Sequence, residues 1–270
     1  MASRFRFRVG GFLLGAVLIA AAGLAAAQDK SAAPRTQSAA PPKASSPAMS
    51  TLDRKAIEDV VREFILNNPE IIVEAVHSLQ EREKQESHQR LKATLVAKRS
   101  ELLNDPATPV GGNPKGDVTI VEFFDYRCGY CKRVMPALQE VLKTDNNVRF
   151  VFKEFPILGP ESVVASKAAL AASMIDKGKY EAFHWALMKT TGALPESRVM
   201  KIAADAGFDV KALKKAMDDP KIETLIRRNY ALAEALEING TPAFIIGDHV
   251  IRGATDLAAF RQVIAKARGG

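Results

Sequence analysis

Cysteine is scarce in this chain, which has only Cys128 and Cys131 among its 270 residues. Two cysteines three positions apart exclude a framework of disulfides that would join distant parts of the chain. They also leave a structural zinc site short of ligands, because such a site takes about four from cysteine and histidine. The four histidines lack ligand-like spacing and are His77, His88, His184 and His249. We expect no metal and no cofactor and interpret the pair as a redox site, with half of a metal site or two unreactive thiols as the alternatives.

The chain also lacks a dense basic stripe with interleaved aromatic residues. Its formal net charge is +7, but basic residues in the first 50 positions supply most of this excess. The remainder is only mildly basic, so a surface built to hold a phosphate backbone is not expected. We therefore predict no nucleic-acid partner.

Residues 1–27 have the pattern of a secretory signal peptide. Three arginines and no acid precede an apolar run that ends in small residues at Ala25, Ala26 and Ala27. These small residues form an A-x-A cleavage site, so we expect cleavage after Ala27 and export to the periplasm. An uncleaved membrane anchor is the alternative, although four glycines weaken the run as a spanning helix. No cysteine follows the cleavage position, which excludes a lipid-anchored lipoprotein.

Three further segments precede the main domain. Residues 28–50 are rich in Ala, Pro, Ser and Lys and are predicted to be a disordered linker. Residues 51–104 have apolar residues at helical spacing, interrupted by an almost wholly polar stretch at 80–90. We predict a helical oligomerisation region followed by a stalk, and a solvated helix is the alternative for the polar stretch. Residues 105–116 are rich in Pro and Gly and are predicted to be a second linker.

Residues 117–270 have the pattern of an α/β domain. The predicted strands are 118–124, 148–152, 243–246 and 249–251. Helices are predicted at 129–143 and 256–268, and a mostly helical insertion at about 161–236. The order strand, helix, strand, helical block, hairpin, helix indicates a thioredoxin-like fold with a helical insertion.

Cys128-Gly129-Tyr130-Cys131 directly follows the first of these strands and begins the first helix. Unpaired backbone N–H groups and the helix dipole favour a thiolate on the first cysteine of such a pair. The second cysteine, one turn later, can close a small disulfide ring. Lys132 and Arg133 add positive charge beside the thiols.

The chain resembles the DsbA family of exported thiol-disulfide oxidoreductases, and within it the ScsC-like proteins that carry an N-terminal oligomerisation region. The resemblance rests on the Cys-Gly-Tyr-Cys site, on the Lys153–Leu158 segment and on Gly240-Thr241-Pro242. It implies a cis Pro242 beside the disulfide, with Thr241 touching the substrate and the sulfurs. An ordinary trans proline is the alternative. Gly129 and Tyr130 are expected to help set the redox potential.

Glu122 lies in the middle of the first strand, six residues before Cys128. It matches an acidic position of the family that lies below the disulfide. Buried there, it would have a raised pKa and could relay a proton to or from Cys131. An edge position with the carboxylate in water is the alternative.

The leading hypothesis is a protein disulfide isomerase that exchanges disulfides in periplasmic proteins, because several active sites around a shared cleft suit isomerisation. The resemblance implies a membrane electron donor of the DsbD or ScsB kind and a homo-oligomer. Dimer and trimer both fit the apolar pattern, and the resemblance favours the trimer. A monomeric-type dithiol oxidase served by a DsbB-like oxidant is the alternative, and a soft-metal-binding or chaperone module is a third.

Overall fold

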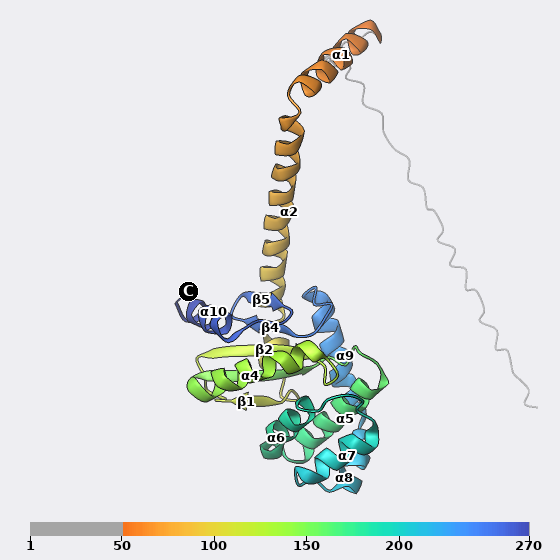
Figure 1. Cartoon of the computed structure of the whole chain (residues 1–270), viewed down its shortest axis with the longest axis vertical. Coiled ribbons are helices and arrows are strands. Elements are labelled where there is room, and N and C mark those ends of the chain that lie inside the picture. Colours follow the sequence, from red (N-terminus) through yellow and green to blue (C-terminus); the bar gives the residue numbers. More distant parts are fainter. Residues whose placement is uncertain (1–50, 270) are drawn as a thin grey trace, which may run out of the picture. The chain divides into compact units, whose positions relative to one another are not determined.

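The computed structural model describes residues 51–269 of the chain (Figure 1). The predicted signal peptide and first linker, residues 1–50, lie outside the described residues. The chain divides into two units between Phe64 and Ile65. No helix within the described range has the length and hydropathy of a membrane span.

Three helices precede the sheet, in line with the helical pattern of residues 51–104. They are α1 (Thr51–Asn67), α2 (Glu70–Ala97) and α3 (Arg99–Leu103). Five large apolar residues of α1 are about half or more exposed, namely Ile57, Val60, Val61, Phe64 and Leu66. The first part of α2 also has exposed apolar side chains, at Ile72, Val73, Val76 and Leu79. Ile57, Val60, Val61 and Phe64 thus form an exposed apolar stripe on α1, from which Leu66 is excluded by half a turn, and the four residues of α2 form a second exposed stripe.

The polar stretch at residues 80–90 lies within α2, which is continuous across it. Opposite charges one turn apart support the helix there, with Lys84 and Glu81 3.7 Å apart and Arg90 and Glu86 also 3.7 Å apart. Such exposed pairs contribute a few tenths of a kcal/mol each.

The sheet has five strands in the order β1-β3-β2-β4-β5. The strands are β1 (Val110–Gly112), β2 (Val118–Phe124), β3 (Val148–Glu154), β4 (Ala243–Ile246) and β5 (His249–Arg252). β2 and β3 pair in parallel, and the other pairs are antiparallel. Four strands are those expected from the sequence. β1 is additional, since it lies in the segment 105–116 for which a linker was expected.

Seven helices follow β1 in the described chain, and their order confirms the predicted fold. They are α4 (Gly129–Thr144), α5 (Pro160–Ile175), α6 (Lys177–Met188), α7 (Glu196–Asp205), α8 (Val210–Met217), α9 (Pro220–Ala235) and α10 (Leu257–Gly269). Helices α5 to α9 form the predicted insertion between β3 and β4. Figure 1 shows α5, α6, α7 and α8 grouped together.

Alternate residues of β2 face the two sides of the sheet, as the period of a strand requires. Ile120 and Phe124 belong to a large buried cluster with side chains of α4, α5, α6 and α10. Val121 and Phe123 belong to a second cluster on the opposite side. Glu122 therefore points to the same side as Ile120 and Phe124, toward α4.

The second cluster contains the end of the N-terminal helical region. Leu95 of α2 and Leu102 of α3 are buried against Val121 and Phe123, and Leu102 is 2 % exposed. Lys153 of β3 reinforces this contact, because its Nζ donates to the carbonyl oxygen of Glu101 at 2.8 Å. The last turns before residue 104 are thus part of the core of the sheet domain.

Candidate functional site

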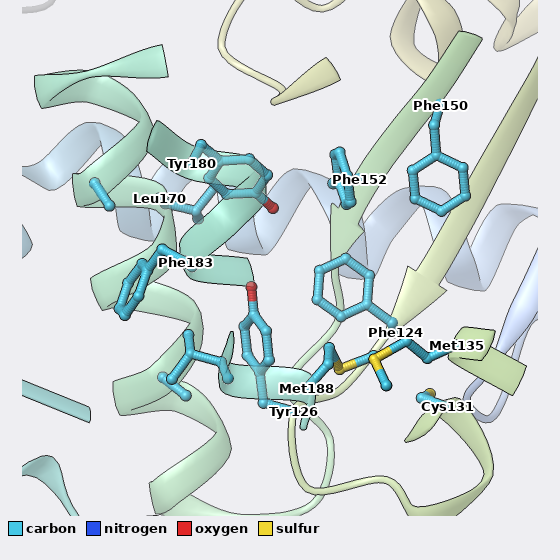
Figure 2. Close-up of a cluster of buried hydrophobic side chains, with 14 of the residues drawn as sticks. Phe124, Tyr126, Cys131, Met135, Phe150, Phe152, Leu170, Tyr180, Phe183 and Met188 are labelled. Atoms are coloured by element: carbon cyan, nitrogen blue, oxygen red, sulfur yellow. The ribbon is translucent and has the colours of Figure 1, made fainter. Parts of the chain in front are cut away.

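The two cysteines lie at the start of α4. Cys128 is its N-cap residue, and its Sγ accepts a hydrogen bond from the backbone N–H of Cys131 at 3.4 Å. Both thiols are free. Cys128 retains 5 % exposure and Cys131 retains none, so only Cys128 can meet another molecule first. Cys131 lies in the large cluster together with Phe124 and Met135 (Figure 2).

The surroundings drive the pKa values of the two thiols apart. A hydrogen bond from the Cys131 thiol, assisted by backbone N–H groups at the helix start, lowers the pKa of Cys128 to about 5 against the opposing effect of burial. Burial, the hydrogen bond to Cys128 and the charge of Glu122 raise the pKa of Cys131. Near neutral pH Cys128 is a thiolate and Cys131 is a thiol, which makes Cys128 the nucleophile.

The loop before β4 lies against Cys128. The Thr241–Pro242 peptide bond is cis, and the Sγ of Cys128 lies 3.2 Å from the carbonyl oxygen of Thr241, to which it donates when the thiol is protonated. Ala243, the next residue, pairs with Phe123 near the end of β2. This register brings the loop to the end of the strand that leads to the cysteines, as the resemblance implies.

Glu122 is fully buried beneath the cysteines. Neither of its carboxylate oxygens has a hydrogen-bond partner among the residues that the structure describes. Burial raises its pKa well above the usual value, and the nearby charges of Cys128 and Glu154 raise it further. The alternative of an edge position in water does not apply, and the burial of the side chain favours its protonated form.

Asp125 was not singled out from the sequence, although it fixes the loop that leads to Cys128. Its side chain accepts from the backbone N–H of Arg127 at 2.7 Å, from that of Leu158 at 2.9 Å and from the Ser162 hydroxyl at 2.8 Å. Three bonds of this kind hold the loop and the start of α5 together. An acid directly after a buried strand and three residues before Cys128 was the available signal.

Glu154 lies at the centre of a second buried polar group that sequence reasoning missed. Its carboxylate accepts from the hydroxyls of Ser166 at 2.7 Å, Tyr126 at 3.0 Å and Tyr180 at 3.3 Å. Burial raises the pKa of Glu154 to about 8 despite these donors. Figure 2 shows the Tyr126 and Tyr180 side chains among the apolar residues of the cluster. The group ties β3 and the loop after β2 to α5 and α6.

The residues between and after the cysteines lie at the surface. Tyr130 is 57 % exposed, and the guanidinium of Arg133 lies 4.8 Å from the centre of its ring. Gly129 is the first residue of α4. Tyr130 is therefore available for contact with another molecule at the cysteine pair.

No group of three or more His, Cys, Asp or Glu side chains within residues 51–269 is arranged to hold a metal ion. The described site brings together the two sulfurs, the buried acid and the proline loop.

Two family models match different parts of the chain. The DSBA-like thioredoxin domain matches residues 119–265, and the copper resistance protein ScsC N-terminal domain matches residues 53–86. The second match lies on α1 and on the first half of α2.

Solved structures with the same fold include a thioredoxin-like oxidoreductase from Silicibacter pomeroyi, which is 45 % identical, with a TM-score of 0.61, over 64 % of this chain and 98 % of that one. A linker-deletion mutant of Proteus mirabilis ScsC is 27 % identical, with a TM-score of 0.63, over 83 % of this chain and 99 % of that one. A periplasmic thioredoxin-like protein from Salmonella enterica serovar Typhimurium is 30 % identical, with a TM-score of 0.59, over 64 % of this chain and 96 % of that one.

Among curated relatives the chain matches the Na⁺/H⁺ antiporter NhaA 1 of Salinispora arenicola, with 27 % identity over 163 residues. The match covers 60 % of this chain and 25 % of the antiporter, so the chain spans about a quarter of that relative's length. The DSBA-like match, by contrast, covers the strands β2 to β5 from residue 119 on, the helical insertion and both cysteines. On this match, which takes in more than half of its residues, the chain belongs to the DsbA-like thioredoxin-domain family.

Proposed function

We propose that this chain is an exported thiol-disulfide oxidoreductase that isomerises disulfides in periplasmic proteins. The observation that carries the proposal is the contrast between the thiols. Cys128, with a pKa of about 5, lies next to the cis-proline loop, and the fully buried Cys131 has a raised pKa. A low-pKa thiol beside a protected one is the arrangement that thiol-disulfide exchange requires.

The reaction begins when the Cys128 thiolate attacks a client disulfide. A mixed disulfide forms between Cys128 and the client, and the other client sulfur leaves as a thiolate. In isomerisation, a different client thiolate then attacks the mixed disulfide and releases Cys128 unchanged. In reduction, Cys131 attacks Cys128, its proton leaves, and two electrons pass to the client as the protein disulfide closes.

Each supporting residue has a role in this scheme. Glu122 takes up or returns the proton of Cys131, since it is the buried acid on the same side of the sheet. Thr241 and Pro242 orient an extended client segment beside Cys128. Gly129 and Tyr130 help set the reduction potential and meet the client at the surface.

The proposed organisation has an oligomerisation region and stalk that begin at residue 51 and a catalytic domain at 117–270. The last turns of the stalk, up to residue 104, pack on the sheet of that domain, and the segment 105–116 connects the two and adds β1 to the sheet. The uncovered apolar stripes of α1 and α2 and the match to the ScsC N-terminal domain support a homo-oligomer, for which we propose a trimer. Several active sites in one assembly favour isomerisation. A membrane electron donor of the DsbD or ScsB kind would keep the cysteines reduced.

Periplasmic localisation is also part of the proposal. It rests on the signal pattern of residues 1–27, followed by the linker at 28–50, and on the likeness to a periplasmic thioredoxin-like protein.

The test is reactivation of scrambled ribonuclease by the reduced mature protein, residues 28–270. The same chain with Val60→Asp and Val61→Asp should remain folded and lose most of the isomerase activity, and Cys128→Ser should lose all of it. If no chain reactivates the enzyme and the oxidised protein instead rapidly oxidises reduced ribonuclease, the protein is a dithiol oxidase with a DsbB-like partner.

A further inference from the structure

Two cations from different helices bind the loop between α6 and α7. Lys132, next to Cys131, donates through Nζ to the carbonyl oxygen of Thr190 and, at 3.3 Å, to its hydroxyl. Arg198 of α7 donates through one terminal nitrogen to the carbonyl oxygens of Thr191 at 2.7 Å and Ala193 at 2.9 Å. Because Lys132 and Arg198 hold adjacent residues of one short loop, their charges lie close together.

A third cation is connected to the same loop by a carboxylate that binds both. Arg127, the residue before Cys128, pairs with Glu161 at 3.1 Å, and Glu161 accepts from the backbone N–H of Leu194 at 3.1 Å. The end of the loop is thus tied to the residue beside the nucleophile. Together with Arg133, which lies over the exposed Tyr130 ring, these cations form what we call the cationic rim, namely Arg127, Lys132, Arg133 and Arg198.

Most of the charge of the cationic rim is not neutralised within residues 51–269. Lys132 and Arg198 bind neutral carbonyl oxygens, and neither they nor Arg133 have a carboxylate within ion-pair distance there. Glu161 balances only Arg127. Burial and then the charge of Arg198 lower the pKa of Lys132, and the charges of Asp125 and Cys128 oppose this shift, so Lys132 lies near both a second cation and the nucleophile. Three of the four cations, Lys132, Arg133 and Arg198, are thus outside ion pairs within the described residues and can interact with a bound molecule.

We propose that the cationic rim selects clients in which acidic residues flank the reacting cysteine. A client segment bound beside Cys128 places its neighbouring side chains near the rim, where carboxylates are attracted and ammonium groups are repelled. The inference rests on the proposed function, because it names the chemistry of the clients at the same site. It assigns Lys132 and Arg198 to client recognition, and their hydrogen bonds to the loop fix them in position.

Three synthetic peptides test the proposal with the reduced mature protein. They have the same length and the same internal disulfide and differ only in having two Asp, two Ser or two Lys residues beside the cysteines. In each reaction the peptide disulfide gains two electrons and two protons, and Cys128 and Cys131 become a disulfide. The second-order rate constant is measured at about 10 mM and at about 1 M salt, where the Debye length is about 30 Å and about 3 Å.

We expect the Asp peptide to react about tenfold faster than the Lys peptide at low salt, with the ratio falling toward one at high salt. Lys132→Gln with Arg198→Gln should remove most of the ratio. Lys132→Glu with Arg198→Glu should invert it, so that the Lys peptide becomes the better substrate. A gain of this kind cannot come from misfolding.

Lys143→Glu is the matched control, because Lys143 is an exposed residue in the last turn of α4. A helix of 16 residues is about 24 Å long, so this substitution reverses one lysine charge of the same helix at the far end from Cys128. It should leave the ratio as in the unmodified protein.

Equal rates for the three peptides, or a ratio that survives in the charge-reversed variant, would overturn the proposal. An equal slowing of all three peptides, accompanied by a raised Cys128 pKa, would also overturn it, since the charges would then tune the thiol rather than choose the client. If the unmodified protein reduces no peptide at all, the proposed function itself fails.

Discussion

Apolar side chains at helical spacing occur in two regions of the N-terminal helices, and only one region buries them. Val60 in α1 is 66 % exposed, whereas Leu102 in α3 is 2 % exposed. The sequence pattern is similar in both regions. The difference is that Leu102 packs on the sheet with Val121 and Phe123, while α1 and the first part of α2 leave their stripes uncovered. Helical periodicity therefore predicts a face to be buried but not what covers it.

The exposed stripes leave apolar surface in contact with water, which is unfavourable unless a second copy of the chain covers it. Full burial of one Val, Leu, Ile or Phe side chain contributes about 1.5–3 kcal/mol. The stripes of α1 and α2 together hold eight such side chains, four on each helix, and about half of each residue's surface is exposed. Self-association that covers most of them gains enough free energy to offset the loss of translational freedom.

The largest expected effect comes from breaking this association. Val60→Asp with Val61→Asp places two carboxylates in the α1 stripe and should convert the oligomer into monomers. Light scattering coupled to gel filtration measures the mass. The melting temperature of the sheet domain should change little, because neither valine belongs to its core clusters.

A control distinguishes the stripe from a general effect of charge on α1. Lys55 and Arg62 lie on the opposite side of this helix at helical spacing. Lys55→Asp with Arg62→Asp should leave the oligomer intact. If these substitutions also give monomers, or if the valine variant keeps its mass, the stripe is not the interface.

The next effect concerns the buried end of the same region. Leu102→Ala should lower the free energy of unfolding by about 2–5 kcal/mol, because it leaves a cavity against the sheet. Val96→Ala, at a position 70 % exposed, should change it by less than about 0.5 kcal/mol. Urea denaturation of the two variants measures the difference. Equal values would mean that the end of this region is not part of the domain core.

The smallest expected effect is the loss of unfolding free energy when an ion pair is removed from either region. Arg268 binds Asp117 and Asp145 at 2.7–3.1 Å and so joins α10 to the start of β2 and the end of α4. Arg268→Ala should cost about 1 kcal/mol. Arg90→Ala, which removes a pair 3.7 Å apart on the polar part of α2, should cost less than about 0.5 kcal/mol.

The cost of Arg268→Ala should also depend on pH. The hydrogen bond from Arg268 holds the pKa of Asp145 below its usual value of 3.8. An acid whose pKa is lowered in the folded protein stabilises that state at pH values above its ordinary pKa. The loss of unfolding free energy in Arg268→Ala should therefore be full at neutral pH and shrink as the pH falls below about 4. A cost that is unchanged at pH 3, measured by the same urea denaturation, would contradict this explanation.

The sequence predicts the parts of this structure that repeat a regular pattern. Residues 118–124 form a mostly apolar run flanked by turn-forming residues, and the predicted strand is the observed β2. β1 has only three residues, two of them glycine, and offers no periodicity to detect. Leu95 and Leu102 follow a long polar stretch, so their burial depends on tertiary contacts that spacing alone does not show.

The candidate site likewise has some residues that the sequence predicts and others that it does not. The cysteines and Thr241-Pro242 were found because they stand in recognisable short motifs. Asp125 was not found, because its bonds reach residues 33 and 37 positions away in the chain. The cationic rim is equally non-local, since Arg198 lies in the helical insertion. The position of Arg198 beside Lys132 depends on how α6 and α7 pack.

The most direct test of the account is the pH dependence of Cys128 alkylation in the reduced protein. Iodoacetamide reacts with the thiolate, and mass spectrometry assigns the modified cysteine. The rate should be half-maximal near pH 5 and constant above about pH 7, because hydrogen bonds at the start of α4 stabilise the thiolate. A rate that is half-maximal near pH 8.5, the value of an ordinary thiol, would contradict the claim that this fold activates Cys128.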